Sequence, residues 1–145
     1  MSQENVDLVR SAVEAYRNPE VLALLARGDL PLDLFDPDIE WDASRVADLV
    51  PDLADVYMGH EGVRTYWRRW FAAWDALQFE VQDVLDAGDH VVVLIHNERQ
   101  QGRHSGIWTE LPPWAMIFTM RDGMLVRWRV YPNHQSALKA VGLEE

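Results

Sequence analysis

The chain has 145 residues, no cysteine, seven tryptophans and a net charge of −11. This length suits one domain spanning residues 1–145, and the missing cysteines exclude disulfides, thiolate catalysis and cysteine-ligated metal centres. The acidic charge argues against a nucleic-acid partner. No run of apolar residues is long enough to cross a membrane, and the first residues do not resemble a signal peptide, so we expect a cytoplasmic protein with no membrane partner.

The first third of the chain predicts two helices and a strand. Apolar residues recur at near-helical spacing over residues 4–17, and Pro19 suits the first turn of a second, short helix. Within residues 34–42, Asp36-Pro37-Asp38 predict a turn and residues 39–42 a short strand, in which Trp41 and Asp42 point to opposite sides. Residues 43–58 show no clear periodicity, so we expect a long loop that is either a lid or disordered.

The rest of the chain predicts one long helix, then strands, then a short helix. Residues 60–76 carry an apolar stripe at helical spacing, made of Val63, Trp67, Trp70, Phe71 and Trp74. The strands expected after it are 79–86, 90–101, 114–121 and 124–131. A helix capped by Asn133 ends the chain. Helices followed by antiparallel strands predict an α+β fold with the helices on one face of the sheet.

Regular alternation across the hairpin turn at Asp122-Gly123 divides the last two strands into two faces. One face should turn toward the helices and holds Ala115, Ile117, Thr119, Val126, Trp128 and Val130. The other mixes large apolar residues with arginine, as interface cores do. We expect either that the C-terminal segment covers this second face or that it forms a homodimer through Trp114, Met116, Phe118, Arg127, Arg129 and Tyr131.

Several segments, taken in order, resemble the SnoaL-like branch of the nuclear transport factor 2-like superfamily. They are FDPDIEW at 35–41, GHEGV at 59–63, RDG at 121–123 and ALKAVGL at 137–143. The resemblance covers nearly the whole chain and implies a cone, in which a strongly curved, mostly antiparallel sheet wraps around a long helix. It also implies N-terminal helices, an apolar pocket and frequent dimers. Members include polyketide cyclases, ketosteroid isomerases, epoxide hydrolases and non-enzymatic binding domains, so whether this chain is an enzyme stays open.

Three residues are candidates for catalysis. Arg99 stands where the resemblance to epoxide hydrolases implies an arginine, and it either binds a ligand oxygen or pairs with a surface acid at the rim. The two acids that those enzymes carry are replaced by Gln101 and Val130. Asp42 lies near the place of the ketosteroid isomerase base, although it more simply belongs to a solvated face. His96 and Glu98 form an acid–base pair only if their face of strand 90–101 lines the pocket. The sequence leaves open which face of that strand does so.

The number of tryptophans favours a pocket, because a core of this size needs fewer. The residues predicted to line the pocket are Tyr16, Trp41, Tyr57, Trp67, Trp70, Arg99, Trp128 and Val130. The alternative is that they are ordinary core residues or surface groups. We expect a small hydrophobic, cyclic ligand, bound either by a cyclase- or isomerase-type enzyme or by a non-catalytic dimeric binding domain. No histidine spacing suits a metal, and we expect no cofactor. The place of Trp108 cannot be predicted.

Overall fold

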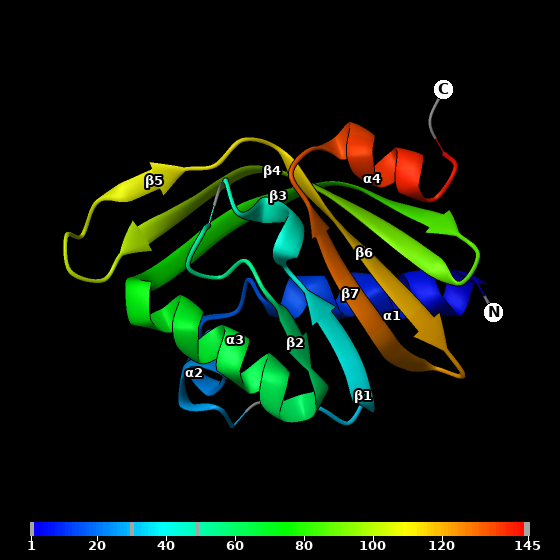
Figure 1. The fold of residues 1–145 in the computed structure, drawn as a ribbon, viewed down its shortest axis with the longest axis horizontal. Coiled ribbons are helices and arrows are strands. Elements are labelled where there is room, and N and C mark those ends of the chain that lie inside the picture. Colours follow the sequence, from blue (N-terminus) through cyan, green and yellow to red (C-terminus); the bar gives the residue numbers. More distant parts are fainter. Residues whose placement is uncertain (1, 30, 49, 144–145) are drawn as a thin grey trace.

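The computed structural model describes residues 2–29, 31–48 and 50–143, and the fold is α+β as predicted (Figure 1). The helices are α1 (Ser2–Ala15), α2 (Pro19–Arg27), α3 (Gly59–Ala73) and α4 (His134–Ala140), with a 3-10 turn η1 (Ser44–Val46). The strands are β1 (Phe35–Asp42), β2 (Val56–Met58), β3 (Trp74–Ala87), β4 (His90–Gly102), β5 (Trp108–Glu110), β6 (Trp114–Arg121) and β7 (Met124–Tyr131).

These strands form one seven-stranded sheet in the order β2-β1-β7-β6-β4-β3, with β5 paired to β4. Every neighbouring pair is antiparallel except β1 and β7, which are parallel. The sheet is strongly curved, and α1 and α3 pack on its concave side (Figure 1). The cone implied by the resemblance is therefore the observed architecture.

The predicted aromatic stripe forms α3 and faces the core. The helix ends at Ala73, earlier than predicted, and Trp74 instead begins β3. Gly62 lets α3 approach β2 closely, because a Cβ at this position would lie 2.8 Å from the backbone carbonyl carbon of Tyr57. The buried residues of the helix are Val63, Tyr66, Trp67, Trp70 and Phe71.

Helices cover both faces of the sheet, and not one face as the sequence predicts. On the concave side, Val91, Val93 and Ile95 of β4 belong to the main core together with α1 and α3. On the convex side, α4 covers a second, smaller cluster that includes Val92 and Leu94. The C-terminal segment thus covers part of the convex face. Such coverage is one of the two alternatives that the sequence leaves for the second face of the hairpin, the other being a homodimer.

The predicted faces of the last hairpin are wrong because a β-bulge interrupts β7. Met120 pairs with Leu125 but Thr119 pairs with Arg127, so Val126 has no partner on β6. One extra residue reverses the alternation of everything beyond it.

The proposed dimer residues consequently do not share a face. Trp114, Met116 and Phe118 point to the concave side, where they pack with Trp128 and Val130. The convex side instead carries Arg127, Arg129 and Tyr131, opposite Thr119, Ile117 and Ala115. These last three residues were predicted to face the helices of the main core, and they lie on the other side of the sheet.

Two short strands are absent from the predicted elements. β2 lies within the loop predicted over 43–58, where it pairs with β1, and η1 lies in the same segment. β5 contains Trp108, whose ring lies 4.6 Å from the guanidinium carbon of Arg99.

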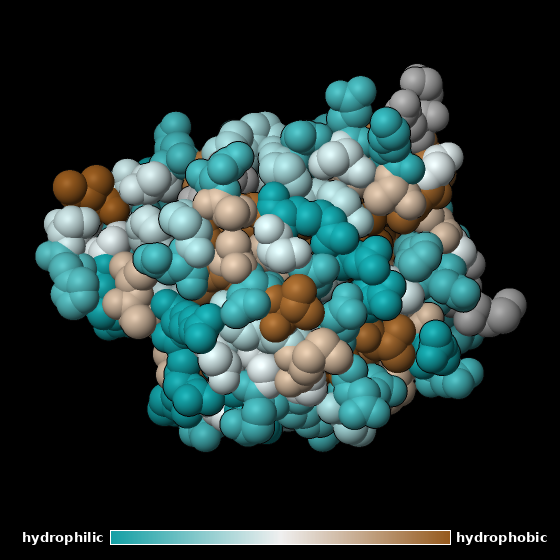
Figure 2. Space-filling model, in the orientation of Figure 1, coloured by the Kyte–Doolittle hydropathy of each residue, from teal (hydrophilic) through white to brown (hydrophobic). Residues whose placement is uncertain are grey.

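The surface exposes few large hydrophobic side chains. On the face shown in Figure 2, hydrophobic residues form small separate patches among hydrophilic ones. The large hydrophobic residues exposed in the described part of the chain are Leu34, Val56, Met58, Ile107 and Leu143. Over those same ranges, no helix combines the length and the apolar composition that crossing a membrane requires.

Candidate functional site

An apolar cavity of about 90 Å³ lies between α1, α3 and the concave side of the sheet. The segment after β1 contributes Val46, Val50 and Leu53 to its wall. Roughly 150 Å³ is enough for an apolar cavity to hold benzene, so this cavity admits a molecule of few non-hydrogen atoms unless its wall moves. The aromatic residues that line it are Tyr16, Trp41, Tyr66, Trp67, Trp70, Phe79, Trp114 and Trp128.

One acid lies in this wall among the described residues, and it is Glu98 of β4. Its side chain is buried, with 5% of its surface exposed. Trp114 Nε1 donates to Glu98 Oε1 at 3.1 Å, and Gln100 Nε2 donates to Glu98 Oε2 at 2.8 Å. The carboxyl group is therefore held in place by two neutral donors at the edge of an apolar space.

Burial raises the pKa of Glu98 to about 7, although the hydrogen bonds from Gln100 and Trp114 work in the opposite direction. A carboxyl group with this pKa is present in both protonation states near neutral pH, as a general acid or base requires. Burial also raises the pKa of Tyr66, with a smaller contribution from the charge of Glu98, and it raises the pKa of Tyr16. Both tyrosines therefore present neutral hydroxyl groups near this acid.

Gln100 can serve either protonation state of Glu98. Its Oε1 is buried and has no hydrogen-bond partner, while its Nε2 donates to the carboxylate. A half-turn of the amide would offer Oε1 to Glu98, which suits a protonated carboxyl that donates.

A β-bulge in β4 turns Glu98 into the cavity. Gln78 pairs with Arg99 and Glu80 pairs with His96, so Phe79 faces two residues, Asn97 and Glu98. Asn97 has a φ of 53°, in the left-handed region that asparagine tolerates better than most residues. The inward face of β4 therefore changes from odd-numbered residues up to Ile95 to even-numbered residues from Glu98 onward.

Outside Glu98 lies a wider and more polar groove of about 550 Å³. Leu77, Phe79, Glu98 and Leu111 line both the groove and the inner cavity. The groove adds polar and charged residues, namely Arg17, Gln78, Glu80, Asn97, Arg99 and Glu110. Glu98 therefore stands where an apolar space meets a polar one.

Most of the predicted wall residues do line the cavity, namely Tyr16, Trp41, Trp67, Trp70, Trp128 and Val130. Tyr57 does not, because its hydroxyl donates to the carbonyl of Leu53 at 3.0 Å and accepts from Arg69 Nη1 at 3.1 Å. Arg99 is exposed, outside the cavity, and its Nε donates to Gln78 Oε1 at 2.9 Å.

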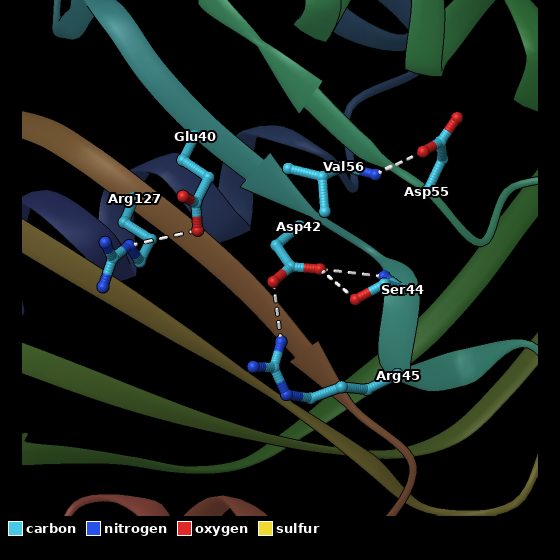
Figure 3. Close-up of polar contacts among 7 residues, drawn as sticks. All are labelled: Glu40, Asp42, Ser44, Arg45, Asp55, Val56 and Arg127. Carbon is cyan, nitrogen blue, oxygen red and sulfur yellow. Dashed lines mark hydrogen bonds and ion pairs between the residues drawn. The ribbon is translucent and has the colours of Figure 1, made fainter.

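Of the other two catalytic candidates, Asp42 lies on the convex side of β1, away from the cavity. Ser44 donates to it through its backbone N–H and its hydroxyl, and Arg45 Nη1 lies 2.8 Å from Asp42 Oδ2 (Figure 3). Burial opposes ionisation of Asp42, but the bonds from Ser44 and Arg45 outweigh it and lower the pKa. A carboxylate held in this way stabilises the turn after β1 and is not available as a base.

His96 also lies outside the cavity. Its Nε2 is 3.1 Å from Glu80 Oε2, on the outward face of β4, and the bulge at Asn97 separates it from Glu98. The predicted acid–base pair of His96 and Glu98 is therefore not formed. No three histidine, aspartate or glutamate side chains of residues 2–29, 31–48 and 50–143 come close enough together to bind a metal ion.

Comparison with known proteins supports the same architecture. No curated protein matches the chain. An NTF2-like protein of unknown function from Burkholderia pseudomallei has a similar structure, with a TM-score of 0.67, 19% identity and coverage of 97% of this chain and 98% of that one.

Two further structures contain small organic molecules. TerC, co-crystallised with polyporic acid, has a TM-score of 0.63 at 18% identity, with 92% of this chain and 97% of that chain covered. A protein from Catenulispora acidiphila with a ketosteroid isomerase-like fold, in complex with trimethylamine, has a TM-score of 0.59 at 18% identity, with 89% and 87% covered. At these identities the likeness shows the fold alone.

Comparison of the sequence with models of protein families identifies the family directly. The model of the SnoaL-like domain matches residues 12–128, which include α3, Glu98 and every residue of the cavity wall except Val130. This match shows that the chain belongs to the SnoaL-like domain family, and the structural likeness shows that it has the fold of NTF2-like proteins.

Proposed function

We propose that this protein binds a small, largely apolar organic molecule in the cavity and that Glu98 exchanges a proton with it. The observation that carries the proposal is a buried carboxyl group, held by Trp114 and Gln100, at the wall of an apolar cavity. This arrangement supports chemistry of the isomerase or cyclase type, in which a group with a pKa near neutrality moves a proton.

The size of the cavity limits the ligand. A cyclic molecule, as the sequence predicts, needs more than about 90 Å³. Movement of Val46, Val50 and Leu53 would enlarge the inner space, and the outer groove offers room for a substituent beside Glu98. That TerC and the Catenulispora protein were crystallised with polyporic acid and trimethylamine fits a fold that encloses small organic molecules.

A thermal-shift screen against small hydrophobic compounds, cyclic and acyclic, tests the proposal. A ligand present at about 100 times its Kd adds roughly 2.7 kcal/mol to the free energy of unfolding, which for this chain length raises Tm by roughly 5–10 °C. The matched variant is Val130→Phe, which places a ring in the cavity and should abolish the shift. Equal shifts in both proteins, or none with any compound, would contradict binding in the cavity.

The second candidate function is a non-catalytic dimeric binding domain. Because Trp114, Met116 and Phe118 face the core, only the convex face of the sheet is left for the dimer contact. Val56 and Met58 of β2 are exposed there, and the Nε of Arg129 is buried without a hydrogen-bond partner. Arg127 forms a salt bridge with Glu40, in which Arg127 Nε lies 3.2 Å from Glu40 Oε2 (Figure 3). We propose that a second copy covers this face, leaving the cavity unaffected.

Sedimentation analysis of the wild type and of Val56→Asp tests this second candidate. A dimer that Val56→Asp converts to a monomer supports it, whereas a wild-type monomer at high protein concentration refutes it. The exposed residue Ile107, on the loop before β5, provides a control substitution, Ile107→Asp, that should leave a convex-face dimer intact.

A further inference from the structure

Glu98 is a buried acid with no cationic partner in the described part of the chain. Its hydrogen bonds come from neutral groups, an indole and an amide, and no salt bridge between the described residues includes it. The guanidinium of Arg99, one residue further along the strand, bonds Gln78 and lies over Trp108 instead. Buried carboxylates are normally paired, so the missing partner points to a cation supplied from outside.

The walls around this acid are made of aromatic rings. Tyr16, Trp41, Tyr66, Trp67, Trp114 and Trp128 all line the same cavity. The face of an aromatic ring carries negative electrostatic potential, and a cation within about 6 Å of the ring centre is attracted to it, most strongly where water is excluded. Aromatic walls combined with one carboxylate therefore favour a positively charged ligand and disfavour an anion.

We propose that the ligand of this cavity is a small organic ammonium ion, a protonated tertiary amine or a quaternary ammonium, held by Glu98 against the aromatic walls. The inference rests on the binding part of the proposed function, because it assigns a ligand class to the same cavity. Of the two ligands, only the tertiary amine can also exchange a proton with Glu98. A tetramethylammonium head is about as bulky as benzene, so a cavity of about 90 Å³ holds it only after Val46, Val50 and Leu53 move, as a cyclic ligand also requires. The groove that shares Leu77, Phe79 and Leu111 with the cavity gives a longer substituent a path toward solvent.

The proton balance of binding follows from the same pair of charges. A quaternary ammonium binds the carboxylate, so Glu98 must release its proton to solvent wherever it starts protonated. An uncharged tertiary amine instead takes that proton, and the O–H bond of Glu98 is replaced by an N–H bond of the ligand. Because the pKa of Glu98 is about 7, affinity for a quaternary ammonium should rise about tenfold between roughly pH 6 and pH 8.

The test compares tetramethylammonium with tert-butanol, an uncharged molecule of similar shape, by isothermal titration calorimetry. We expect tetramethylammonium to bind more tightly to the wild type, with proton release below pH 7 that appears as a dependence of the heat on the buffer. Glu98→Gln should weaken its binding at least about tenfold, because the counter-charge is lost, and should leave tert-butanol unaffected. The control Glu20→Gln removes an exposed carboxylate at the start of α2, outside the cavity and the groove, and should behave as the wild type.

Two outcomes separate the inference from the proposed function. If tert-butanol binds as tightly as tetramethylammonium, with no proton release and no effect of Glu98→Gln, the ammonium inference is wrong while binding in the cavity stands. If neither binds and the wider screen is also flat, both proposals fail. Should Glu98→Gln not fold, the pH dependence and the proton release of the wild type decide the question alone.

Discussion

Replacement of Glu98 by glutamine should change how the stability of the protein depends on pH. Glutamine has nearly the same shape as the protonated side chain but cannot ionise. Its Oε1 can accept from Trp114 Nε1, and its amide N–H can donate to Gln100 Oε1 if the Gln100 amide makes a half-turn. Gln100 Oε1 is buried and has no partner in the wild type, so the half-turn keeps one hydrogen bond between the two side chains, while Gln100 Nε2 loses its acceptor.

The magnitude follows from the shift in pKa. The pKa of Glu98 rises from 4.5, the ordinary value, to about 7 in the folded protein. Between these values the folded state binds more protons than the unfolded state, so the free energy of unfolding falls as pH rises. At about 1.4 kcal/mol per pH unit, the free energy of unfolding of the wild type falls by roughly 3 kcal/mol over this range. Glu98→Gln does not lose this stability, because glutamine does not ionise.

Urea unfolding followed by tryptophan fluorescence, from about pH 5 to about pH 8.5, measures this difference. The stability of the variant relative to the wild type should increase steadily up to about pH 7 and then level off, since the wild-type carboxyl is fully ionised beyond it. Other titrating groups are common to both proteins and cancel in the comparison. A difference that stays constant with pH would refute the reasoning, because Glu98 would then titrate alike in both states.

Substitutions at three other positions give further predictions. Trp114→Phe removes a hydrogen bond that favours the ionised form of Glu98, so the pH at which stability stops falling should move above about 7, as the same urea titrations would show. Asn97→Ala should cost about 1 kcal/mol and Asn97→Gly only a few tenths, because φ is 53° there, and equal losses would contradict strain at the bulge. Asp42→Asn should cost about 1–2 kcal/mol near neutral pH. This cost should disappear in acid, since the lowered pKa of Asp42 adds stability above its ordinary range that is lost as pH falls.

The fold could be predicted from local patterns because those patterns are strong. The spacing of Val63, Trp67 and Trp70 predicts a helix with one buried face, and α3 buries that face. Pro19 predicts the start of α2, where the side chain of Asn18 accepts from the backbone N–H of Glu20 at 2.8 Å. β2 and β5 escape prediction because each has only three residues, too few to show an alternating pattern.

The candidate site could be predicted only in part. The sequence predicts five of the eight aromatic residues of the wall and misses Tyr66, Phe79 and Trp114. Glu98 entered the prediction only as a partner of His96, whereas the structure gives the two residues opposite faces. The signal that could have separated them is Asn97, a residue that tolerates positive φ and that follows the apolar run 91–95 by two residues.

The wrong faces predicted for the last hairpin and the undecided face of strand 90–101 have the same physical cause. Period-two alternation predicts which side a strand residue takes only while the pairing register is unbroken, and one extra residue reverses every side chain beyond it. The bulge at Val126 brings Trp128 and Val130 to the same side as Trp114, and the bulge at Asn97 brings Glu98 to that side as well. Without the bulge at Asn97, the Glu98 carboxyl and the Trp114 indole would lie on opposite faces of the sheet. The two bulges therefore assemble the acid and its aromatic surroundings, and a search for sites in this fold should begin at such irregularities.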